Sequence, residues 1–278
     1  MSRIDIENLT LIFKQTAGEA AGADFIALDN VSAVIESGTF VCVIGPSGCG
    51  KSTLLSVLEG LVTPTSGRVL IDGTPVNGTG TERAVVFQQY TLFPWMTAKQ
   101  NIVFGIKQTL KKLSEHEAGV RAEKFLEKVG LGGVGDKLPG QLSGGMQQRV
   151  AIARALAVSP KILLMDEPFG AIDAKTRVSL QELLLELWDA DAREDGLCGQ
   201  KKTVVFITHD IDEALLLADT IFFMKPGSIA ETISVPLSRP RAKDGQFFNG
   251  EEYRRLRADL VSKFYQDVRE HIGGEVVL

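Results

Sequence analysis

The sequence of 278 residues predicts an α/β fold that is interrupted by a mostly helical segment. Short apolar runs recur along the chain without polar alternation, as in strands buried on both faces of a parallel sheet. Helical patterns separate these runs, so helices are expected to cover the sheet. From about 97 to 157 the pattern is helical throughout. The apolar runs are 39–45, 161–166, 203–208 and 220–225.

The N-terminal part of the chain predicts strands around one glycine-rich loop. Residues 3–13 roughly alternate apolar and polar side chains, as a half-buried strand does. Residues 16–24 are small and polar, which predicts a loop. The run 39–45 ends at a glycine, and helical spacing begins at Lys51. Two further short strands are predicted at 67–73 and 83–89.

The helical segment contains one helix whose start and buried face are both marked in the sequence. Ser114 and Glu117 have the spacing of a capping box, in which each side chain accepts the other residue's backbone N–H. Gly130 suits the end of this helix. The apolar face between them comprises Ala118, Ala122, Phe125, Leu126 and Val129.

The C-terminal half continues the alternation of strands and helices and then changes character. Helical patterns occupy 178–188 and 210–218, between the later apolar runs. We expect one domain over 3–240, with its helical subdomain at about 89–160. The remaining residues, 241–278, are expected to form a C-terminal helical tail.

Composition and charge exclude several classes of protein. A net charge of −5 gives no electrostatic footprint for nucleic acid. No apolar run approaches the roughly 20 residues of a membrane-spanning helix, and the N-terminus lacks the apolar core of a secretory signal. Cys42, Cys49 and Cys198 are widely spaced, which predicts unpaired thiols in a reducing compartment. We therefore expect a soluble cytosolic protein that binds no nucleic acid.

The stretch GPSGCGKST, residues 45–53, has the spacing of a P-loop and lies between a predicted strand and a predicted helix. Its glycines let successive N–H groups converge on phosphates. Lys51 supplies a cation for the β- and γ-phosphates, and the Ser52 hydroxyl can ligate Mg²⁺. The residues predicted to bind the nucleotide here are Gly45, Pro46, Ser47, Gly48, Cys49, Gly50, Lys51, Ser52 and Thr53.

Two carboxylates follow the apolar strand in the stretch ILLMDEP, residues 162–168. Asp166 ends the strand and is expected to hold magnesium, directly or through water. Glu167 comes next and is placed to orient and deprotonate an attacking water. An acidic pair after a strand is commonly a solvated strand end, but a P-loop in the same chain favours a hydrolytic role.

A second anion-binding start of a helix occurs at LSGGM, residues 142–146. Together with the P-loop and ILLMDEP, this stretch resembles the signature of ABC-transporter ATPases. The resemblance covers roughly 3–240, and the motifs occur in that family's order. It implies a P-loop NTPase core, with a mixed sheet flanked by helices and an inserted mostly helical subdomain, that binds ATP and Mg²⁺ and hydrolyses ATP.

The family resemblance explains why one chain has two anion sites. It implies that two cassettes, either a homodimer or a pair of sister cassettes, pack head to tail with each P-loop facing the other copy's signature helix across ATP. Ser143 would then bond the γ-phosphate, while the N–H groups of Gly144 and Gly145 and the helix dipole favour its charge. The family's usual glutamine is replaced by Met146, and because the preceding three residues carry the phosphate contacts we expect function to be retained.

Other site residues are implied by the resemblance one by one. Gln88, rather than Gln89, matches the glutamine that senses the metal and the attacking water. Asp173 matches the aspartate loop that communicates across the dimer. His209 matches the switch histidine that bonds the γ-phosphate.

An early aromatic residue is expected to stack on adenine, as in related cassettes. Phe13 is the first candidate. Phe25 is the alternative, because the loop between the two residues is longer than usual and blurs the register. The sequence alone leaves this choice open.

A cassette of this kind is expected to act on a separate integral-membrane permease at the inner face of the cell membrane. In related importers the segment Gln88–Trp95 borders the groove that receives a cytoplasmic helix of the permease. Trp95 follows a proline and is the stronger contact candidate, whereas Phe93 is equally compatible with a core position. A periplasmic solute-binding protein would be an indirect partner.

Three short stretches resemble the branch that imports nitrate, sulfonates and taurine: FPWMTAKQNI, LSGGM and VPLSRPR. They imply uptake of a small anion, although another solute class remains an alternative. A soluble ABC ATPase acting on DNA or ribosomes is disfavoured by the acidic charge balance. A non-catalytic regulatory cassette is disfavoured by the presence of Glu167 and His209.

Overall fold

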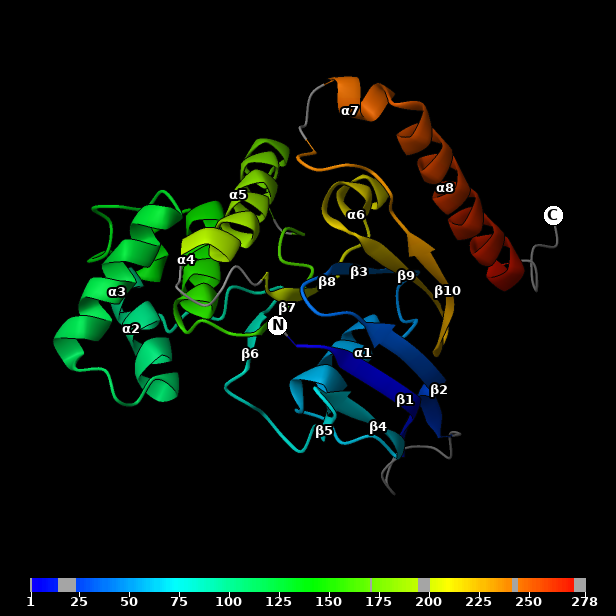
Figure 1. The fold of residues 1–278 in the computed structure, drawn as a ribbon, viewed down its shortest axis with the longest axis horizontal. Helices are drawn as coiled ribbons and strands as arrows, with labels where there is room; N and C mark the ends of the chain where they lie inside the picture. Colours follow the sequence, from blue (N-terminus) through cyan, green and yellow to red (C-terminus); the bar gives the residue numbers. More distant parts are fainter. Residues whose placement is uncertain (1, 15–23, 171, 195–200, 242–244, 273–278) are drawn as a thin grey trace. The chain divides into compact units, whose positions relative to one another are not determined.

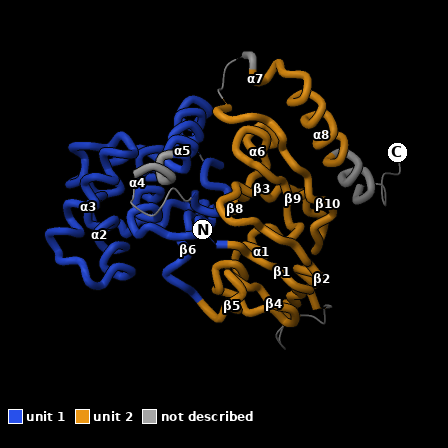
Figure 2. Tube along the Cα trace, in the orientation of Figure 1, with its two compact units in different colours: residues 1–2, 79–204 blue, residues 3–78, 205–278 orange. Residues whose placement is uncertain are grey.

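The computed structural model describes residues 2–14, 24–170, 172–194, 201–241 and 245–272 (Figure 1). Most of the predicted loop at 16–24, as well as Cys198, therefore lies outside the described residues. The chain divides into two compact units (Figure 2). Unit 1 is 1–2 with 79–204, and unit 2 is 3–78 with 205–278.

Unit 2 contains an antiparallel sheet of four strands in the order β2-β1-β4-β5. It also contains the strand order β10-β9-β3-β8, in which β3 and β9 are parallel while β9 and β10 are antiparallel. Its elements are β1 Ile4–Phe13, β2 Phe25–Ile35, β3 Phe40–Ile44, α1 Lys51–Glu59, β4 Ser66–Ile71, β5 Thr74–Pro75, α6 Ile211–Leu217, β9 Thr220–Lys225, β10 Ser228–Ser234, α7 Gly245–Asn249 and α8 Glu251–Ile272.

Unit 1 combines a parallel strand pair with the helical segment that the sequence predicts. Strands β6 and β7 pair in parallel, with Val86 opposite Met165. Strand β8, Thr203–Ile207, has residues in both units. The other elements of unit 1 are β6 Arg83–Val86, α2 Ala98–Thr109, α3 Glu115–Lys128, a 3₁₀ turn Pro139–Gln141, α4 Gly144–Ala157, β7 Ile162–Asp166 and α5 Ala174–Glu194.

Local signals in the sequence account for these elements well. All four apolar runs are strands, and every residue of β3 and β8 is buried. The predicted capping box is confirmed: Ser114 Oγ accepts the Glu117 N–H at 3.2 Å, and Glu117 Oε2 accepts the Ser114 N–H at 2.7 Å. Within the described residues, Cys42 and Cys49 form no disulfide bond, and both are buried.

The predicted mixed sheet is confirmed, because β9 pairs parallel with β3 and antiparallel with β10, while β2 pairs antiparallel with β1. Strand β2 does not show a regular alternation of apolar and polar residues, because Asn30 adopts φ 49° and shifts the side-chain pattern. Strand β10 buries Ile233 but leaves most of its length accessible. In β1 a similar shift occurs at Asn8, φ 48°, where the pairing register with both neighbours changes.

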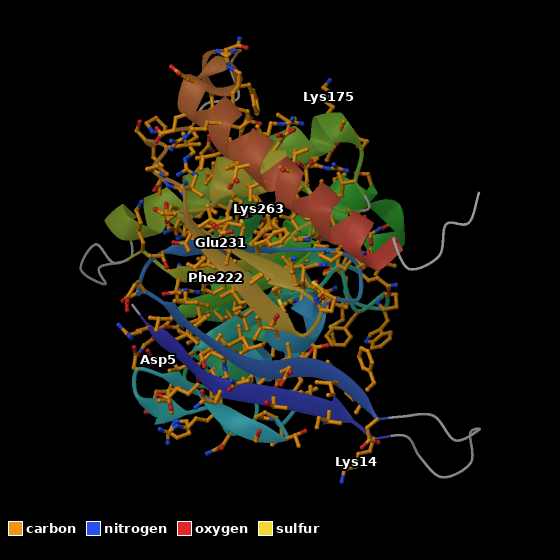
Figure 3. The ribbon with its side chains drawn as sticks, turned by 90° about the vertical axis from the view of Figure 1, so that its right-hand side faces the viewer. Asp5, Lys14, Lys175, Phe222, Glu231 and Lys263 are labelled. Atoms are coloured by element: carbon orange, nitrogen blue, oxygen red, sulfur yellow. The ribbon has the colours of Figure 1, made fainter. Side chains whose placement is uncertain are left out.

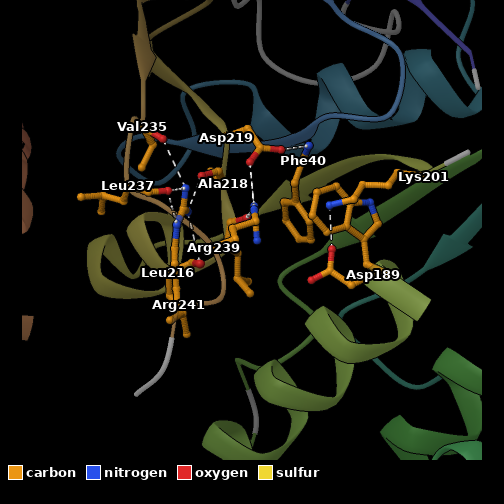
Figure 4. Close-up of polar contacts among 12 residues, drawn as sticks. Phe40, Asp189, Lys201, Leu216, Ala218, Asp219, Val235, Leu237, Arg239 and Arg241 are labelled. Carbon is orange, nitrogen blue, oxygen red and sulfur yellow. Dashed lines mark hydrogen bonds and ion pairs between the residues drawn. The ribbon is translucent and has the colours of Figure 1, made fainter. Parts of the chain in front are cut away.

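The C-terminal end of α6 is held by two arginines of the stretch VPLSRPR (Figure 4). Arg239 pairs with Asp219 at 2.9 Å, and Asp219 also accepts the Phe40 N–H. A cation suits the carbonyl end of a helix. Burial lowers the pKa of Arg241 to about 10. The Arg241 guanidinium donates to the carbonyl oxygens of Leu215, Leu216, Ala218, Val235 and Leu237.

Within the described ranges, no helix combines the length and the apolar character needed to cross a membrane.

Candidate functional site

The predicted site residues divide between the two units. Unit 2 carries the P-loop, both adenine-stacking candidates and His209. Unit 1 carries the strand-end carboxylates, Gln88, the signature residues and Asp173.

The P-loop spans the turn between β3 and α1, and its backbone explains its glycines. Gly50 is the N-cap of α1 with φ 106°, in the left-handed region that favours glycine. A Cβ at Gly50 would lie 2.6 Å from the carbonyl oxygen of Ala27, so a side chain does not fit. Because a glycine N-cap brings no side-chain acceptor, the first N–H groups of α1 are suited to an anion.

Lys51 is the first residue of α1, and its charge is held inside the loop. Its side chain is buried, and Nζ donates to the carbonyl oxygens of Gly45 at 2.9 Å and Pro46 at 2.8 Å. Ser52 follows on the exposed side of the first turn. Cys49 is buried, so its place in the predicted set rests on its backbone. The loop thus presents the Lys51 ammonium and the Ser52 hydroxyl at the start of a helix.

His209 lies at the same sheet edge as the P-loop within unit 2. The preceding residue, Thr208, donates its N–H to the carbonyl oxygen of Val43 at 3.3 Å, and Val43 is two residues before Gly45. His209 itself is exposed. The following Asp210 is the N-cap of α6. The predicted switch histidine therefore lies in a turn that is hydrogen-bonded to β3, the strand that leads into the P-loop.

The two adenine-stacking candidates lie directly opposite each other across the β1–β2 pair. Phe13 is 46% exposed and Phe25 is 59% exposed. Residues directly opposite in an antiparallel pair project on the same face of the sheet. Ala27, two residues after Phe25, is the residue whose carbonyl approaches Gly50. The structure thus gathers both candidates into one exposed aromatic pair beside the P-loop.

Phe13→Ala is expected to weaken ATP binding about tenfold, because stacking of a base on an aromatic ring contributes about 1–3 kcal/mol. Phe25→Ala is the matched variant, with the same truncation at the opposite position, and is expected to have the smaller effect. Titration with ATP measures both. A larger loss with Phe25→Ala would assign adenine to Phe25, and two unchanged affinities would reject stacking on this pair.

The parallel register of β6 and β7 brings Gln88 to the strand-end carboxylates. Gln88 comes two residues after Val86, and Asp166 directly follows Met165, the partner of Val86. Gln88 Nε2 donates to Glu167 Oε2 at 3.4 Å. The amide and the carboxylate therefore lie in contact at one end of the pair.

Glu167 has a strained backbone. Its φ is 42°, in the left-handed region that residues other than glycine seldom occupy, and its carbonyl accepts the Gly170 N–H at 3.1 Å. Such strain costs on the order of 1–3 kcal/mol and is concentrated at functional sites. The turn fixes the carboxylate at the end of β7, where a catalytic base is expected.

Oxygen ligands suited to Mg²⁺ are present among the predicted residues. Mg²⁺ takes hard oxygen donors and retains several waters. On unit 1 these donors are the Asp166 carboxylate and the Gln88 amide oxygen, and on unit 2 the Ser52 hydroxyl. The chemistry of this donor set fits the metal.

The signature begins helix α4 as the sequence indicates. Ser143 is the N-cap, and its Oγ accepts the Met146 N–H at 3.3 Å. Since Met146 takes part through its backbone, its side chain leaves the cap intact. A serine hydroxyl that accepts one hydrogen bond can still donate another. Ser143 is exposed and so retains a donor for an anion.

The two signature glycines also lie close to side chains inside unit 1. A Cβ at Gly144 would lie 2.7 Å from the hydroxyl oxygen of Tyr90. A Cβ at Gly145 would lie 2.4 Å from Cγ2 of Thr176. The lack of side chains at these two glycines therefore avoids crowding within unit 1, and their N–H groups lie at the start of α4.

Asp173 is exposed in front of α5. Its Oδ1 accepts the Thr176 N–H at 3.0 Å, and hydrogen bonding to Thr176 lowers the pKa of the Asp173 carboxyl. The residue is therefore ionised near neutral pH and caps the first turn of the helix.

The aromatic loop after Gln88 presents Trp95, which is 69% exposed. The ring of Phe93 lies 5.5 Å from that of Trp95 and 4.9 Å from that of Phe104, between centroids. Phe93 is partly buried, which leaves both of its predicted roles open. Unit 1 therefore carries an exposed aromatic surface, which we define as Phe93, Trp95 and Phe104.

Sequence reasoning missed the residue that shapes this loop. Asn101 is fully buried in α2, and its Oδ1 accepts the Phe93 N–H at 2.8 Å. Its Nδ2 donates to the carbonyl oxygens of Phe93, Met96 and Thr97. The available signal was a polar residue on an otherwise apolar helix face beside Ala98 and Ile102. A buried, fully bonded amide of this kind rigidifies the segment that it holds.

Sheets flanked by helices, together with a P-loop and strand-end carboxylates, define a P-loop ATPase. A family model described as ABC transporter matches residues 28–170, which is half of the chain. The chain belongs to the ABC transporter family and is an ATP-hydrolysing cassette of that family.

Relatives match nearly the whole chain. An uncharacterised ABC transporter ATP-binding protein of Methanocaldococcus jannaschii is 48% identical over 93% of this chain and 91% of that protein. The nitrate import ATP-binding protein of Synechococcus elongatus is 45% identical, covering 87% of this chain and 86% of the relative. The bicarbonate transport ATP-binding protein of Synechocystis sp. is 44% identical, covering 94% and 89%.

Solved structures agree with the fold. A dimeric ATP-binding cassette in a post-hydrolysis state with ADP and phosphate bound has a TM-score of 0.72 and is 35% identical, covering 84% of this chain and 100% of that one. A second dimeric structure of the same cassette, described as a bacterial ABC transporter cassette, matches equally well, with a TM-score of 0.72. The predicted ABC ATPase fold and ATPase activity are confirmed.

Proposed function

We propose that this ATPase energises an importer of a small anion through a separate permease. The observation that supports this is the near-full-length similarity to one protein named for nitrate import and another named for bicarbonate transport, at 45% and 44% identity. Nitrate and bicarbonate are both small planar oxyanions with one negative charge. Sulfonates and taurine remain members of the same predicted class.

Uptake of isotopically labelled nitrate, bicarbonate and taurine tests this proposal in cells that lack the chain. Uptake of one of these solutes should be lost and should return with the wild-type chain, but not with Lys51→Ala. Unchanged uptake of all three would contradict the anion-importer proposal while leaving the ATPase intact.

The proposed mechanism gives each site residue a stated role, and Gln88 has two. Lys51 and the P-loop N–H groups neutralise the phosphates, and His209 bonds the γ-phosphate. Glu167 takes a proton from the attacking water, which Gln88 orients. Mg²⁺, held by Ser52, Gln88 and Asp166, would supply further charge neutralisation on the phosphate oxygens.

A second cassette is proposed to complete each ATP site. The two solved structures, both of the same cassette, are described as dimeric, which supports pairing of this chain with a second copy. In such a pair Ser143, Gly144 and Gly145 of one copy contact the γ-phosphate held by the other. Asp173 would then carry communication between the copies. Hydrolysis removes the phosphate contact that holds the pair closed.

The aromatic surface is proposed as the contact for the permease, at the inner face of the cell membrane, with a periplasmic solute-binding protein acting on the far side. Exposed aromatic side chains carry much of the binding energy in protein interfaces. The segment Gln88–Trp95 links this surface in sequence to the residue that contacts Glu167.

Trp95→Ala is expected to leave basal ATPase activity unchanged and to reduce coupled uptake at least about tenfold, since truncating an interface anchor typically costs 2 kcal/mol or more. Val178→Ala removes an exposed apolar side chain from α5 of the same unit and serves as the control. Uptake into vesicles and ATPase rate are measured side by side. Normal uptake with Trp95→Ala would remove this residue from the permease contact.

A further inference from the structure

Helix α8 is tied to the start of α6 by three residues that we call the clasp: Asp212, Tyr253 and Arg257. The Tyr253 hydroxyl donates to Asp212 Oδ1 at 2.6 Å. Arg257 Nε donates to the same oxygen, also at 2.6 Å. Tyr253 is 3% exposed, so its hydroxyl is presented from a buried ring rather than from a mobile surface chain.

The clasp acts on the first turn of α6, immediately after His209. Asp210, the neighbour of His209, accepts the N–H of Asp212 at 2.9 Å and that of Glu213 at 3.1 Å. Holding the Asp212 side chain therefore fixes the turn that Asp210 caps. The path from Tyr253 to the backbone at His209 consists of two hydrogen bonds, from Tyr253 to Asp212 and from Asp212 to Asp210, and of the peptide bond between Asp210 and His209.

The other side of the histidine turn is fixed from within the core. Thr208 is buried, and its Oγ1 donates to Glu213 Oε2 and accepts the Asp210 N–H at 3.0 Å. Its own N–H bonds the Val43 carbonyl in β3. The turn is thus held by β3 on one side and by the clasp on the other.

The rest of α8 is anchored to the sheet, which gives the clasp a firm base. Lys263 pairs with Glu231 of β10 at 2.9 Å (Figure 3). The ring of Phe264 meets that of Phe223 in β9 edge-on at 5.3 Å. Leu260, between these contacts and the clasp, is fully buried. Figure 1 shows α8 alongside α6 and β10.

The Tyr253 end of α8 is anchored by aromatic packing. The ring of Tyr253 lies 5.1 Å from that of Phe247 and 5.3 Å from that of Phe248. Burial, together with the bond to Asp212, raises the pKa of the Tyr253 hydroxyl, so it remains a donor at neutral pH. A hydrogen bond to a carboxylate is shorter and stronger than one between neutral groups.

The clasp is expected to matter more for the position of the histidine turn than for the free energy of unfolding. The Arg257–Asp212 pair is about half exposed, and exposed pairs stabilise a fold by about 0–1 kcal/mol. A displacement of about 1 Å at a reacting group, in contrast, can cost on the order of a hundredfold in rate. A contact of small energy is therefore sufficient to alter turnover.

We propose that the clasp positions His209 for ATP hydrolysis, which makes Tyr253 and Arg257 positioning residues of the C-terminal tail. This inference rests on the proposed function, in which His209 bonds the γ-phosphate. Because the clasp does not touch the P-loop, its loss should affect the chemical step and leave nucleotide binding unchanged.

Tyr253→Phe and Arg257→Ala, made in the full chain, test the proposal. Each should lower kcat about three- to tenfold, which corresponds to a loss of about 0.7–1.4 kcal/mol, and leave the KM for ATP within about twofold. Arg255→Ala removes an exposed arginine from the same helix and is the matched control, with kcat unchanged. Thermal unfolding shows whether each variant is folded, since a merely structural role would lower the melting temperature and leave the kcat of the folded enzyme unchanged.

A combination with His209→Ala separates this inference from the role of His209. If the clasp acts through His209, Tyr253→Phe should lower kcat no further in the His209→Ala background. A normal kcat in Tyr253→Phe and Arg257→Ala, beside a slow His209→Ala, would overturn the clasp alone. Full turnover by His209→Ala would instead reject the role of the histidine, and the clasp inference with it.

Discussion

Glu167→Gln is expected to lower kcat for ATP hydrolysis at least about a hundredfold, because general bases contribute about 10²–10⁴-fold to a rate. Glutamine keeps the size of the side chain but cannot take the proton of the attacking water. ATP binding should persist, since the P-loop is unaltered. Phosphate release at saturating ATP gives kcat, and retained nucleotide on the purified protein shows binding.

Glu182→Gln is the control for this change, because it makes the same replacement at an exposed position of α5. Its turnover should match that of the wild type. Glu167 would lose its assignment as the base if Glu167→Gln also hydrolysed ATP at the normal rate.

Lys51→Ala is expected to raise the Kd for ATP at least about thirtyfold, because loss of one buried partner of a bonded charge pair costs about 2–5 kcal/mol. The Lys51 ammonium is held by two loop carbonyls, which position it before any phosphate arrives. Calorimetric titration with ATP measures the change.

Lys51→Met keeps the length of the buried stem, and it distinguishes a lost charge from a collapsed loop. Both variants should bind ATP poorly, whereas Lys112→Ala, at an exposed position between α2 and α3, should bind normally. An unaltered affinity in a folded Lys51→Met would show that the phosphates do not depend on this cation.

The parts of the fold predicted correctly from sequence are those with local causes. The strand–glycine–helix pattern around Gly50 and the capping box of Ser114 and Glu117 each depend on a few neighbouring residues. Buried strands such as β3 and β8 can be predicted because each is a continuous apolar run in the sequence. Such elements can be predicted from one sequence because they do not depend on contacts with distant residues.

The parts that were missed depend on register and on distant pairing. The contact of Gln88 with Glu167 joins residues 79 positions apart and follows from the parallel pairing of β6 with β7. Similarly, the bond from Tyr253 to Asp212 spans 41 positions. Periodicity carries no information on such pairings, and an irregular strand such as β2 hides its own pattern.

The adenine candidates show the same limit. Phe13 and Phe25 look like exclusive alternatives along the chain, because the loop between them is longer than usual and blurs the register. The β1–β2 register places them opposite each other, so the choice becomes one between two rings of the same pair. The question that remains is chemical and can be answered by titration.

The central claim is that two copies of this chain enclose ATP between a P-loop and a signature helix. Light scattering of Glu167→Gln, with and without saturating ATP and Mg²⁺, tests it most directly. We predict a mass of one chain, 30.1 kDa, without nucleotide and twice that mass with ATP. A protein that demonstrably carries ATP yet remains at the mass of one chain would contradict the claim.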